Sequence, residues 1–379
     1  MTNFDAIIVG GGPAGSTAAW HLTLAGLHVA VIDKQSFPRD KVCAGWITPN
    51  VLTTLEIDPE EYASGRTIQA ITGFRTGQIM GRHTDTIYDN PVSYGIRRRE
   101  FDHYLLQRSE ATKITGQPVK TIRRIGRSFI INESFQTPLL IGAGGHFCPV
   151  ARYLGAKIGS GERVVAAKEI EFEMSPHQQQ LCAVVPERPE LYFCEDLKGY
   201  AWVFRKDGFL NIGLGREDNH KLSEHIDQFI QFLTDTERVP FELPSSLHGH
   251  AYLLYGHGTR NAIGDGVILI GDSLGLAYPE SGEGILPAIE SASLAANVIL
   301  AANNDYRKDK LLCYPEKLEA RFGKASSASA WKKWLIPAAG RKYISEKLVT
   351  NPWFAHHMVM DRWFLHSNRP ALHAQNRHQ

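Results

Sequence analysis

Residues 5–15 read Asp5-Ala-Ile-Ile-Val-Gly-Gly-Gly-Pro-Ala-Gly15, an apolar run that leads into a glycine-rich loop. The apolar run is typical of a buried parallel strand. The loop fits the pattern G-x-G-x-x-G, in which the first glycine allows a tight turn, the second lets backbone approach a pyrophosphate, and the third lets a helix pack closely on the strand. The free N–H groups at the start of that helix attract phosphate. We therefore expect a dinucleotide to contact Gly10, Gly12, Pro13, Ala14 and Gly15.

The residues after this loop complete a βαβ unit. Residues 16–25 predict a helix that ends at Gly26, and residues 29–32 predict a second apolar strand. Asp33 closes that strand, close to the distance at which an acidic residue meets a ribose 2′-hydroxyl, and Lys34 follows it. We predict that both contact the cofactor. Because FAD and NAD share this ribose, the unit alone does not distinguish them.

A second strand end, far along the chain, favours FAD over NAD. Residues 267–272 form another apolar strand that ends in Gly-Asp, and a helical stretch follows from Ile285 to Ala302. The carboxylate can accept a hydrogen bond from a ribityl hydroxyl, a group that NAD lacks. Glycines at the helix start can bring backbone N–H groups, and the positive end of the helix dipole, to the pyrimidine end of a flavin. The FAD contacts predicted here are Gly271, Asp272, Pro279, Gly282, Gly284 and Ile285.

Five segments occur in the order and spacing of one flavoprotein superfamily: residues 10–15, residues 37–45 (Phe-Pro-Arg-Asp-Lys-Val-Cys-Ala-Gly), residues 98–102 (Arg-Arg-Glu-Phe-Asp), residues 200–204 (Tyr-Ala-Trp-Val-Phe) and residues 271–284. With them the chain resembles the p-hydroxybenzoate hydroxylase-like flavoproteins and, among these, the geranylgeranyl reductase family. The resemblance implies an α/β fold with a Rossmann-type FAD-binding domain, an inserted β-rich substrate domain and C-terminal helices. We expect residues 1–60, 90–165 and 255–310 to form the FAD domain, residues 61–89 and 166–254 the substrate domain, and residues 311–379 the helical region.

The resemblance also suggests roles for residues between the two fingerprints. In the family, the segment that matches residues 37–45 runs past the flavin, so Cys43 becomes a candidate catalytic residue, as a polarisable contact or a weak proton donor. The alternative of equal weight is a small buried hydrophobe. Ala44 replaces one of two glycines that usually follow the cysteine. Arg98 matches a family arginine that helps to hold FAD, against the alternative of an exposed basic turn, and Val119 completes the predicted FAD contacts.

The electron donor stays open between NAD(P)H and a reduced ferredoxin. Residues 141–145 (Ile-Gly-Ala-Gly-Gly) resemble a further segment of the FAD domain. Related hydroxylases have an Asp-Gly pair there that contributes to binding of the pyridine nucleotide. This chain has Gly144-Gly145 instead, which puts direct use of NAD(P)H in doubt.

An aromatic face is predicted on the substrate side. Tyr200, Trp202 and Phe204 alternate with other residues, so a strand places all three on one face. In the family the matching segment lies over the flavin and lines an apolar cavity, which makes Tyr200 and Trp202 candidate catalytic residues. The plainer alternative is an aromatic face packed on its own core. Arg205 stands where the family has proline, either at the rim of the cavity, where it meets an anionic head group, or in a solvated turn.

The C-terminal residues mix aromatic and basic side chains from Ala330 onward. Such mixing occurs in helices that contact membrane interfaces, but Pro337, Gly340 and Pro352 divide the stretch, which favours helices packed on the main domain. The histidines suggest no metal site, because no carboxylate or cysteine partner is evident beside His356-His357 or beside His248 and His250.

The composition sets broad limits. A formal net charge of +1 gives no electrostatic case for nucleic acid as a partner. The 5 cysteines are scattered and odd in number, which predicts a reducing compartment and neither disulfides nor a zinc site. With no signal-peptide pattern and no apolar run long enough to cross a bilayer, we expect a cytoplasmic protein. The resemblance implies a small apolar molecule as its substrate.

Two enzyme classes follow from the flavoprotein resemblance. The first is a reductase, in which hydride from flavin N5 reduces a carbon–carbon double bond of an apolar or isoprenoid-like substrate. The second is a monooxygenase or halogenase that acts through a flavin hydroperoxide. Residues 199–205 (Gly-Tyr-Ala-Trp-Val-Phe-Arg) do not match the tryptophan-rich halogenase segment, so the reductase is favoured. A non-catalytic flavin carrier is the third hypothesis, and an electron-donor protein is a further expected partner of a reductase.

Overall fold

The computed structural model describes residues 1–159, 162–217, 221–244, 246–324 and 350–372. Its centre is a six-stranded sheet in the order β19-β20-β13-β2-β3-β9. The strands pair in parallel except β19 with β20. The bounds are β2 (Ala6–Val9), β3 (Val29–Ile32), β9 (Thr112–Ile114), β13 (Leu139–Gly142), β19 (Ile263–Gly264) and β20 (Val267–Leu269).

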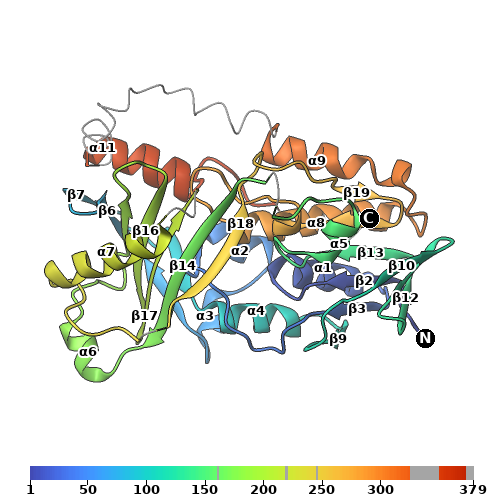
Figure 1. The fold of residues 1–379 in the computed structure, drawn as a ribbon, viewed down its shortest axis with the longest axis horizontal. Coiled ribbons are helices and arrows are strands. Elements are labelled where there is room, and N and C mark those ends of the chain that lie inside the picture. The colour runs from blue at the N-terminus through green and yellow to red at the C-terminus, as the bar shows by residue number, and fades with distance from the viewer. Residues whose placement is uncertain (160–161, 218–220, 245, 325–349, 373–379) are drawn as a thin grey trace.

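Helices cover this sheet because its apolar strands are buried on both faces. The helix predicted after the glycine loop is α1, and it packs between α4 and α8 (Figure 1). A small sheet in the order β1-β12-β11-β10 packs against the six-stranded sheet. These elements are α1 (Pro13–Leu24), α4 (Arg98–Gln107), α5 (Pro149–Tyr153), α8 (Ile285–Ala301), η2 (Lys308–Leu311), α9 (Cys313–Phe322), β1 (Thr2–Asn3), β10 (Ile122–Ile125), β11 (Ser128–Ile131) and β12 (Phe135–Thr137).

A seven-stranded sheet, ordered β18-β14-β17-β16-β15-β6-β7, forms the second part of the molecule. All its pairs are antiparallel except β15 with β6. A three-stranded sheet, β4-β8-β5, lies between the two large sheets. The bounds are β4 (Trp46–Ile47), β5 (Ile68–Ile71), β6 (Gly73–Gln78), β7 (His83–Ile87), β8 (Ser93–Ile96), β14 (Val164–Glu173), β15 (Glu190–Phe193), β16 (Gly199–Lys206), β17 (Phe209–Arg216) and β18 (His248–Leu253), with helices α2 (Pro49–Thr54), α3 (Pro59–Ala63) and α6 (Pro176–Leu181).

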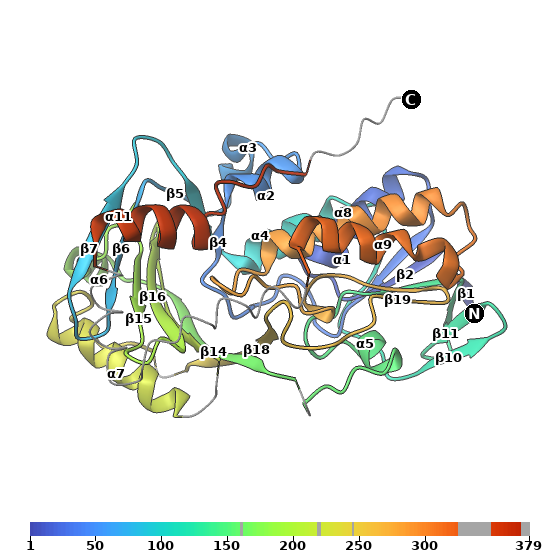
Figure 2. The same cartoon turned by 90° about the horizontal axis from the view of Figure 1, so that it is seen from above.

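The two faces of the seven-stranded sheet have different covers. On one face Ala201 and Val203 of β16 pack with α7 (Leu222–Asp235). On the other, Trp202 and Phe204 pack with the C-terminal elements α11 (Pro352–Phe354) and η4 (Ala355–Phe364), which cross the sheet in Figure 2. The prediction of one shared aromatic face is confirmed. The described C-terminal residues pack on the sheet, as favoured, whereas residues 325–349 lie outside the described part of the chain.

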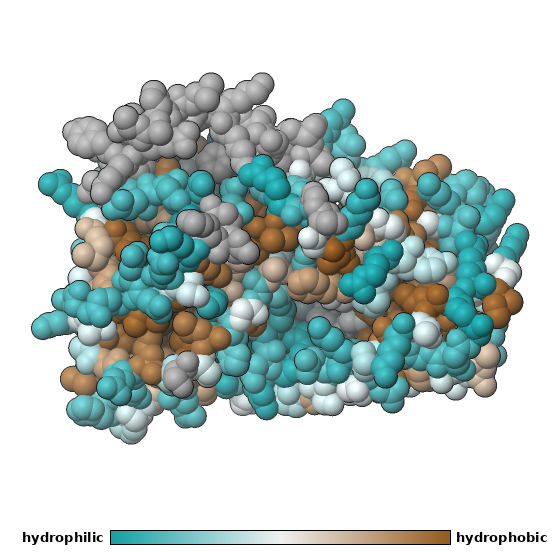
Figure 3. All heavy atoms as spheres, in the orientation of Figure 1, coloured by the Kyte–Doolittle hydropathy of each residue, from teal (hydrophilic) through white to brown (hydrophobic). Residues whose placement is uncertain are grey.

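The predicted α/β fold class is confirmed. Every strand of the six-stranded sheet comes from residues expected in the FAD domain. The strands of the seven-stranded sheet come from residues expected in the substrate domain, except that β14 begins two residues earlier, at Val164. In the face drawn in Figure 3, hydrophobic residues reach the surface over the seven-stranded sheet in several groups separated by hydrophilic ones. None of the described helices is long and apolar enough to cross a membrane.

Candidate active site

The three glycines of the first loop differ in what the fold demands of them. Gly10 has φ +113°, and a side chain there would overlap the carbonyl of Ala143. A side chain at Gly15 would overlap the carbonyl of Gly10. At Gly12, in contrast, the nearest atom to an added Cβ is Arg39 Nη2 at 3.5 Å. The fold therefore requires Gly10 and Gly15 but leaves room at Gly12, which opens the N-terminus of α1 to a ligand.

Arg39 supplies an unpaired buried donor beside this opening. Its guanidinium forms an ion pair with Asp102 at 3.0 Å and lies 4.8 Å from the centre of the Phe37 ring. Its Nη1 is buried and has no hydrogen-bond partner among the described residues. A buried N–H group without an acceptor costs free energy, so the position favours an anionic oxygen. The donor set of Arg39 and the first turn of α1 fits a diphosphate such as that of FAD.

Asp102 is shared by two arginines. Arg98 binds it through two hydrogen bonds of 2.8 Å, and both side chains are buried. Burial favours the neutral carboxyl, but Arg98 and Arg39 hold the pKa of Asp102 below its usual value. Arg98 also donates to the Cys43 thiol. The alternative of an exposed basic turn at Arg98 was therefore wrong, and the structure brings Arg98 next to the predicted catalytic cysteine.

The predicted ribose site lies at the end of β3. Asp33 accepts hydrogen bonds from the backbone N–H groups of Gly11 (2.7 Å) and Gln35 (2.8 Å), so its carboxylate is fixed against the glycine loop. Val119 lies in the segment after β9, which is joined to Asp33 by a backbone hydrogen bond from Gln117. Lys34 is exposed. Asp33 thus borders the loop, whereas the FAD contacts of Val119 and Lys34 stay predictions.

The second fingerprint brings Asp272 to the start of α8. Asp272 lies in the short helix η1 (Gly271–Ser273), and its Oδ1 is 3.0 Å from where a Cβ on Gly284 would be. Burial raises the pKa of Asp272, and the cationic Lys41 and Arg98 oppose this rise. No hydrogen bond to the Asp272 carboxylate is found within the described residues, which leaves both oxygens available to hydroxyl donors. Pro279, Gly282 and Ile285 lie on the same loop and helix start.

Lys41, His250 and Tyr252 join this site although the sequence analysis assigned them no role. Lys41 Nζ lies 2.7 Å from His250 Nε2. Burial, with Arg98 nearby, lowers the pKa of Lys41 to about 8, and burial beside Lys41 lowers that of His250 to about 3. His250 is thus neutral and accepts the hydrogen bond. Tyr252 Oη lies 2.5 Å from where a Cβ on Gly282 would be, so this glycine makes room for the hydroxyl.

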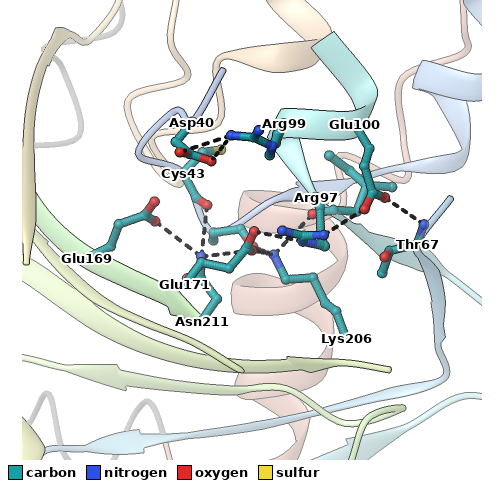
Figure 4. Close-up of polar contacts among 12 residues, drawn as sticks. Asp40, Cys43, Thr67, Arg97, Arg99, Glu100, Glu169, Glu171, Lys206 and Asn211 are labelled. Atoms are coloured by element: carbon teal, nitrogen blue, oxygen red, sulfur yellow. Dashed lines mark hydrogen bonds and ion pairs between the residues drawn. The ribbon is translucent and has the colours of Figure 1, made fainter. Parts of the chain in front are cut away.

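Figure 4 shows how buried polar groups hold the cysteine segment on the seven-stranded sheet. Lys206 is fully buried, and its ammonium donates to the carbonyls of Ala44 (2.9 Å) and Ile96 (3.0 Å) and to the Glu171 carboxylate. Burial alone would raise the pKa of Glu171, but Lys206 lowers it below its usual value. This ammonium therefore joins β16 to the residues around Cys43 and to the end of β8.

Asn211 extends the same network towards the aromatic face. Its amide donates to the Cys43 carbonyl at 3.2 Å and accepts from Trp202 Nε1 at 2.7 Å. Glu169, 5% exposed, lies beside it. Burial raises the pKa of Glu169 to about 7, although the Cys43 backbone N–H and Lys206 favour its charged form. The site thus holds a carboxyl that changes its charge near neutral pH, and nothing in the local sequence of Glu169 signalled it.

The aromatic face meets the second fingerprint directly. Tyr200 Oη donates to the Ser281 carbonyl at 2.6 Å. Trp202 lies over Gly213, where a side chain would overlap the indole. Phe364 of η4 covers the face, 5.3 Å from the Tyr200 ring and 5.4 Å from the Trp46 ring between centroids. The aromatic face is therefore packed on the chain's own core, as the plainer interpretation had it, and it also contacts the loop before α8.

Both interpretations of Arg205 were wrong. The period of two places it on the opposite face from Tyr200 and Trp202, where its Nη1 approaches the Gln179 carbonyl at 3.4 Å. The turn lies one residue later, since Lys206 pairs with Phe209 across Asp207 and Gly208. Arg205 is therefore neither at the rim of the aromatic face nor in the turn. Cys43 is half-buried and packs against an apolar cluster, so a catalytic role and a small buried hydrophobe both stay open as interpretations.

Comparison with known proteins agrees with this geometry. Residues 5–85 match the family model described as FAD dependent oxidoreductase. A digeranylgeranylglycerophospholipid reductase of Methanosphaera stadtmanae is 28% identical, over 84% of this chain and 80% of the relative. A geranylgeranyl diphosphate reductase of Rhodobacter capsulatus is 27% identical, over 79% of this chain and 75% of the relative.

Solved structures share the fold. A geranylgeranyl bacteriochlorophyll reductase-like protein from Thermoplasma acidophilum superposes with a TM-score of 0.78 at 21% identity, covering 96% of this chain and 97% of that one. A mutant of the halogenase PltM in complex with FAD gives a TM-score of 0.68 at 15% identity, covering 86% of this chain and 77% of that one. The chain is therefore an FAD-dependent oxidoreductase, homologous to the geranylgeranyl and digeranylgeranylglycerophospholipid reductases.

Proposed function

We propose that this protein reduces a carbon–carbon double bond in an apolar, isoprenoid-like substrate. The observation that carries the proposal is the contact between the aromatic face and the second fingerprint, made by the hydrogen bond from Tyr200 to Ser281. It gives an apolar surface beside the loop that we assign to the flavin ring. The names of the curated relatives, which are similar over most of their length, support the same substrate class.

The FAD contacts are proposed residue by residue. Gly12, Arg39 and the N-terminus of α1 would hold the diphosphate, Asp33 a ribose, and Asp272 the ribityl hydroxyls. Backbone N–H groups at Gly282 and Gly284 would meet the pyrimidine end of the ring. When bound and reduced, FAD supplies a hydride at N5.

The protein's own residues bind the substrate, exclude water and hold a proton. An apolar chain that displaces Phe364 from the aromatic face would contact Trp202 and Tyr200 and be bound by burial rather than by hydrogen bonds. Reduction of a double bond also needs a proton at the second carbon. Glu169, hydrogen-bonded to the Cys43 backbone and to Asn211, is our candidate for the group that holds this proton at neutral pH.

We predict that purified protein carries one non-covalent FAD and that Gly12→Val loses it. A valine at Gly12 has room in the folded chain but fills the space that the diphosphate needs. Flavin absorbance and the melting temperature of the apoprotein measure the two effects separately. Gly249→Val, at an open position on β18, is the matched control. Colourless wild-type protein that FAD does not reconstitute contradicts the assignment.

Asp272→Ala is expected to weaken FAD binding by about 1.5–3 kcal/mol, the scale of a charge-assisted hydrogen bond. Asp272→Asn keeps the shape of the side chain and one acceptor oxygen, so this variant should lose less FAD-binding free energy than Asp272→Ala. Fluorescence titration of the apoproteins with FAD gives the affinities. Equal affinity of wild type and Asp272→Ala excludes a role for this carboxylate in holding the cofactor.

Trp202→Ala is expected to slow anaerobic reoxidation of the reduced enzyme by an isoprenoid alkene by roughly ten- to a hundredfold, because the substrate is positioned less tightly. Stopped-flow flavin absorbance measures the rate. Trp353→Ala, at a tryptophan that is 63% exposed, should leave it unchanged. If wild-type enzyme is reoxidised by oxygen alone, the reductase proposal fails in favour of an oxygenase or a halogenase.

Glu169→Gln tests the protonated carboxyl. The pKa of Glu169 is about 7 in the folded protein and about 4.5 in the unfolded chain. The stabilisation that the protonated carboxyl gives to the folded state is therefore complete below pH 4.5 and is lost as pH rises to 7. The unfolding free energy of the wild type should therefore fall by roughly 3 kcal/mol relative to Glu169→Gln across this window, and by no more above it. Denaturant titrations between pH 4 and 8 measure it. Parallel pH profiles rule out a buried protonated Glu169.

A further inference from the structure

Two imidazoles and a carboxylate meet on η4, away from the flavin site. His356, His357 and Asp361 each offer one ligand atom, and these atoms lie within 4.8 Å of one another. Nδ1 of His357 is 3.2 Å and Nε2 of His356 is 3.8 Å from the same carboxylate oxygen, Oδ2 of Asp361. The prediction that this histidine pair has no carboxylate partner was wrong: Asp361 lies four residues after His357, a spacing that already makes two residues neighbours on a helix.

The π-helical winding of η4 brings His356 to the carboxylate that His357, four residues before Asp361, would also meet in an α-helix. In an α-helix, residues five apart point about 140° away from each other, so Asp361 would leave the face that carries His356. A π-helix bonds residue i to residue i+5, so Asp361 comes back above the two histidines. Such helices are rare and are frequently found at functional sites.

Tyr88 orients the carboxylate. Its hydroxyl donates to Asp361 Oδ1 at 2.8 Å, which leaves Oδ2 directed at the histidines. Hydrogen bonds of this kind fix ligating carboxylates in metal sites. The Tyr88 ring also contacts His356 edge-on, and the two imidazoles stack with 4.5 Å between centroids. Side chains of His356, His357 and Asp361 are 36%, 48% and 29% exposed, so an ion can enter from solvent and keep bound water.

We propose that His356, His357 and Asp361 bind a divalent transition-metal ion, with Zn²⁺ as the physiological occupant. Two imidazole nitrogens and one carboxylate oxygen suit Zn²⁺, which takes three protein ligands and a water in open sites. The half-exposed imidazoles turn towards the carboxylate without disturbing the core. Phe364, which covers the aromatic face, also lies on η4. An ion bound to three residues of η4 fixes the conformation of this helix and so stabilises the cover of the aromatic face. The site itself does not depend on the proposed reductase function.

The test uses untagged, full-length protein freed of metal by a chelator. Calorimetric titration with ZnCl₂ at pH 7.5 should show one site per chain, and zinc should raise the melting temperature. Asp361→Ala and the double variant His356→Ala/His357→Ala should each weaken binding at least tenfold and abolish the rise.

Two controls separate ligation from other effects. His177→Ala removes an exposed histidine on α6 and should leave zinc binding unchanged. Tyr88→Phe removes the hydrogen bond to Asp361 but no ligand, so it should weaken zinc binding by less than Asp361→Ala and keep the one-site stoichiometry. Absence of zinc binding, or binding that survives in the double histidine variant, overturns the proposal, because any zinc would then lie elsewhere on the chain.

Discussion

The buried ammonium of Lys206 is the constraint on which the candidate site depends. It lies on the substrate-side sheet, yet two of its acceptors are carbonyls of the cysteine segment and of β8. A buried charge is tolerated only when it is paired and hydrogen-bonded, and breaking such a pair typically costs about 3–5 kcal/mol. The contacts of Lys206 with Glu171 and the two carbonyls therefore fix the position of Cys43 relative to the sheet. Asn211 connects the Cys43 carbonyl to Trp202 by two hydrogen bonds.

The rest of the site follows from that fixed position. Cys43 meets Arg98, which shares Asp102 with Arg39, so the cysteine segment is tied to α4 as well as to the sheet. Tyr200 connects the sheet to the loop before α8. The Arg39 guanidinium beside the N-terminus of α1 and the apolar face consequently lie at opposite ends of one continuous set of contacts. This arrangement suits a cofactor held by its charged part while its ring faces an apolar substrate.

Local patterns in the sequence predicted the parts of the site that are local in space. The glycine loop, Asp33 and the Gly-Asp strand end lie at strand ends that their own neighbours specify, and the period of two correctly placed the three aromatics on one face. Lys41, His250, Tyr252 and Asn211 were missed because their contacts depend on how distant strands register. The error at Arg205 came from treating it as a neighbour of the aromatics when the same period turns it away. The partner of His356 was missed because a π-helix changes which residues share a face.

The product of one turnover without oxygen tests the central claim most directly. Photoreduced enzyme is mixed anaerobically with a geranylgeranyl-type alkene in D₂O, and the molecular mass of the product is measured by mass spectrometry. The account predicts a product with one double bond fewer, with hydrogen or deuterium added across that bond, in an amount up to one per FAD. Product that forms only when oxygen is admitted, and that carries an added oxygen or halogen atom, would contradict it.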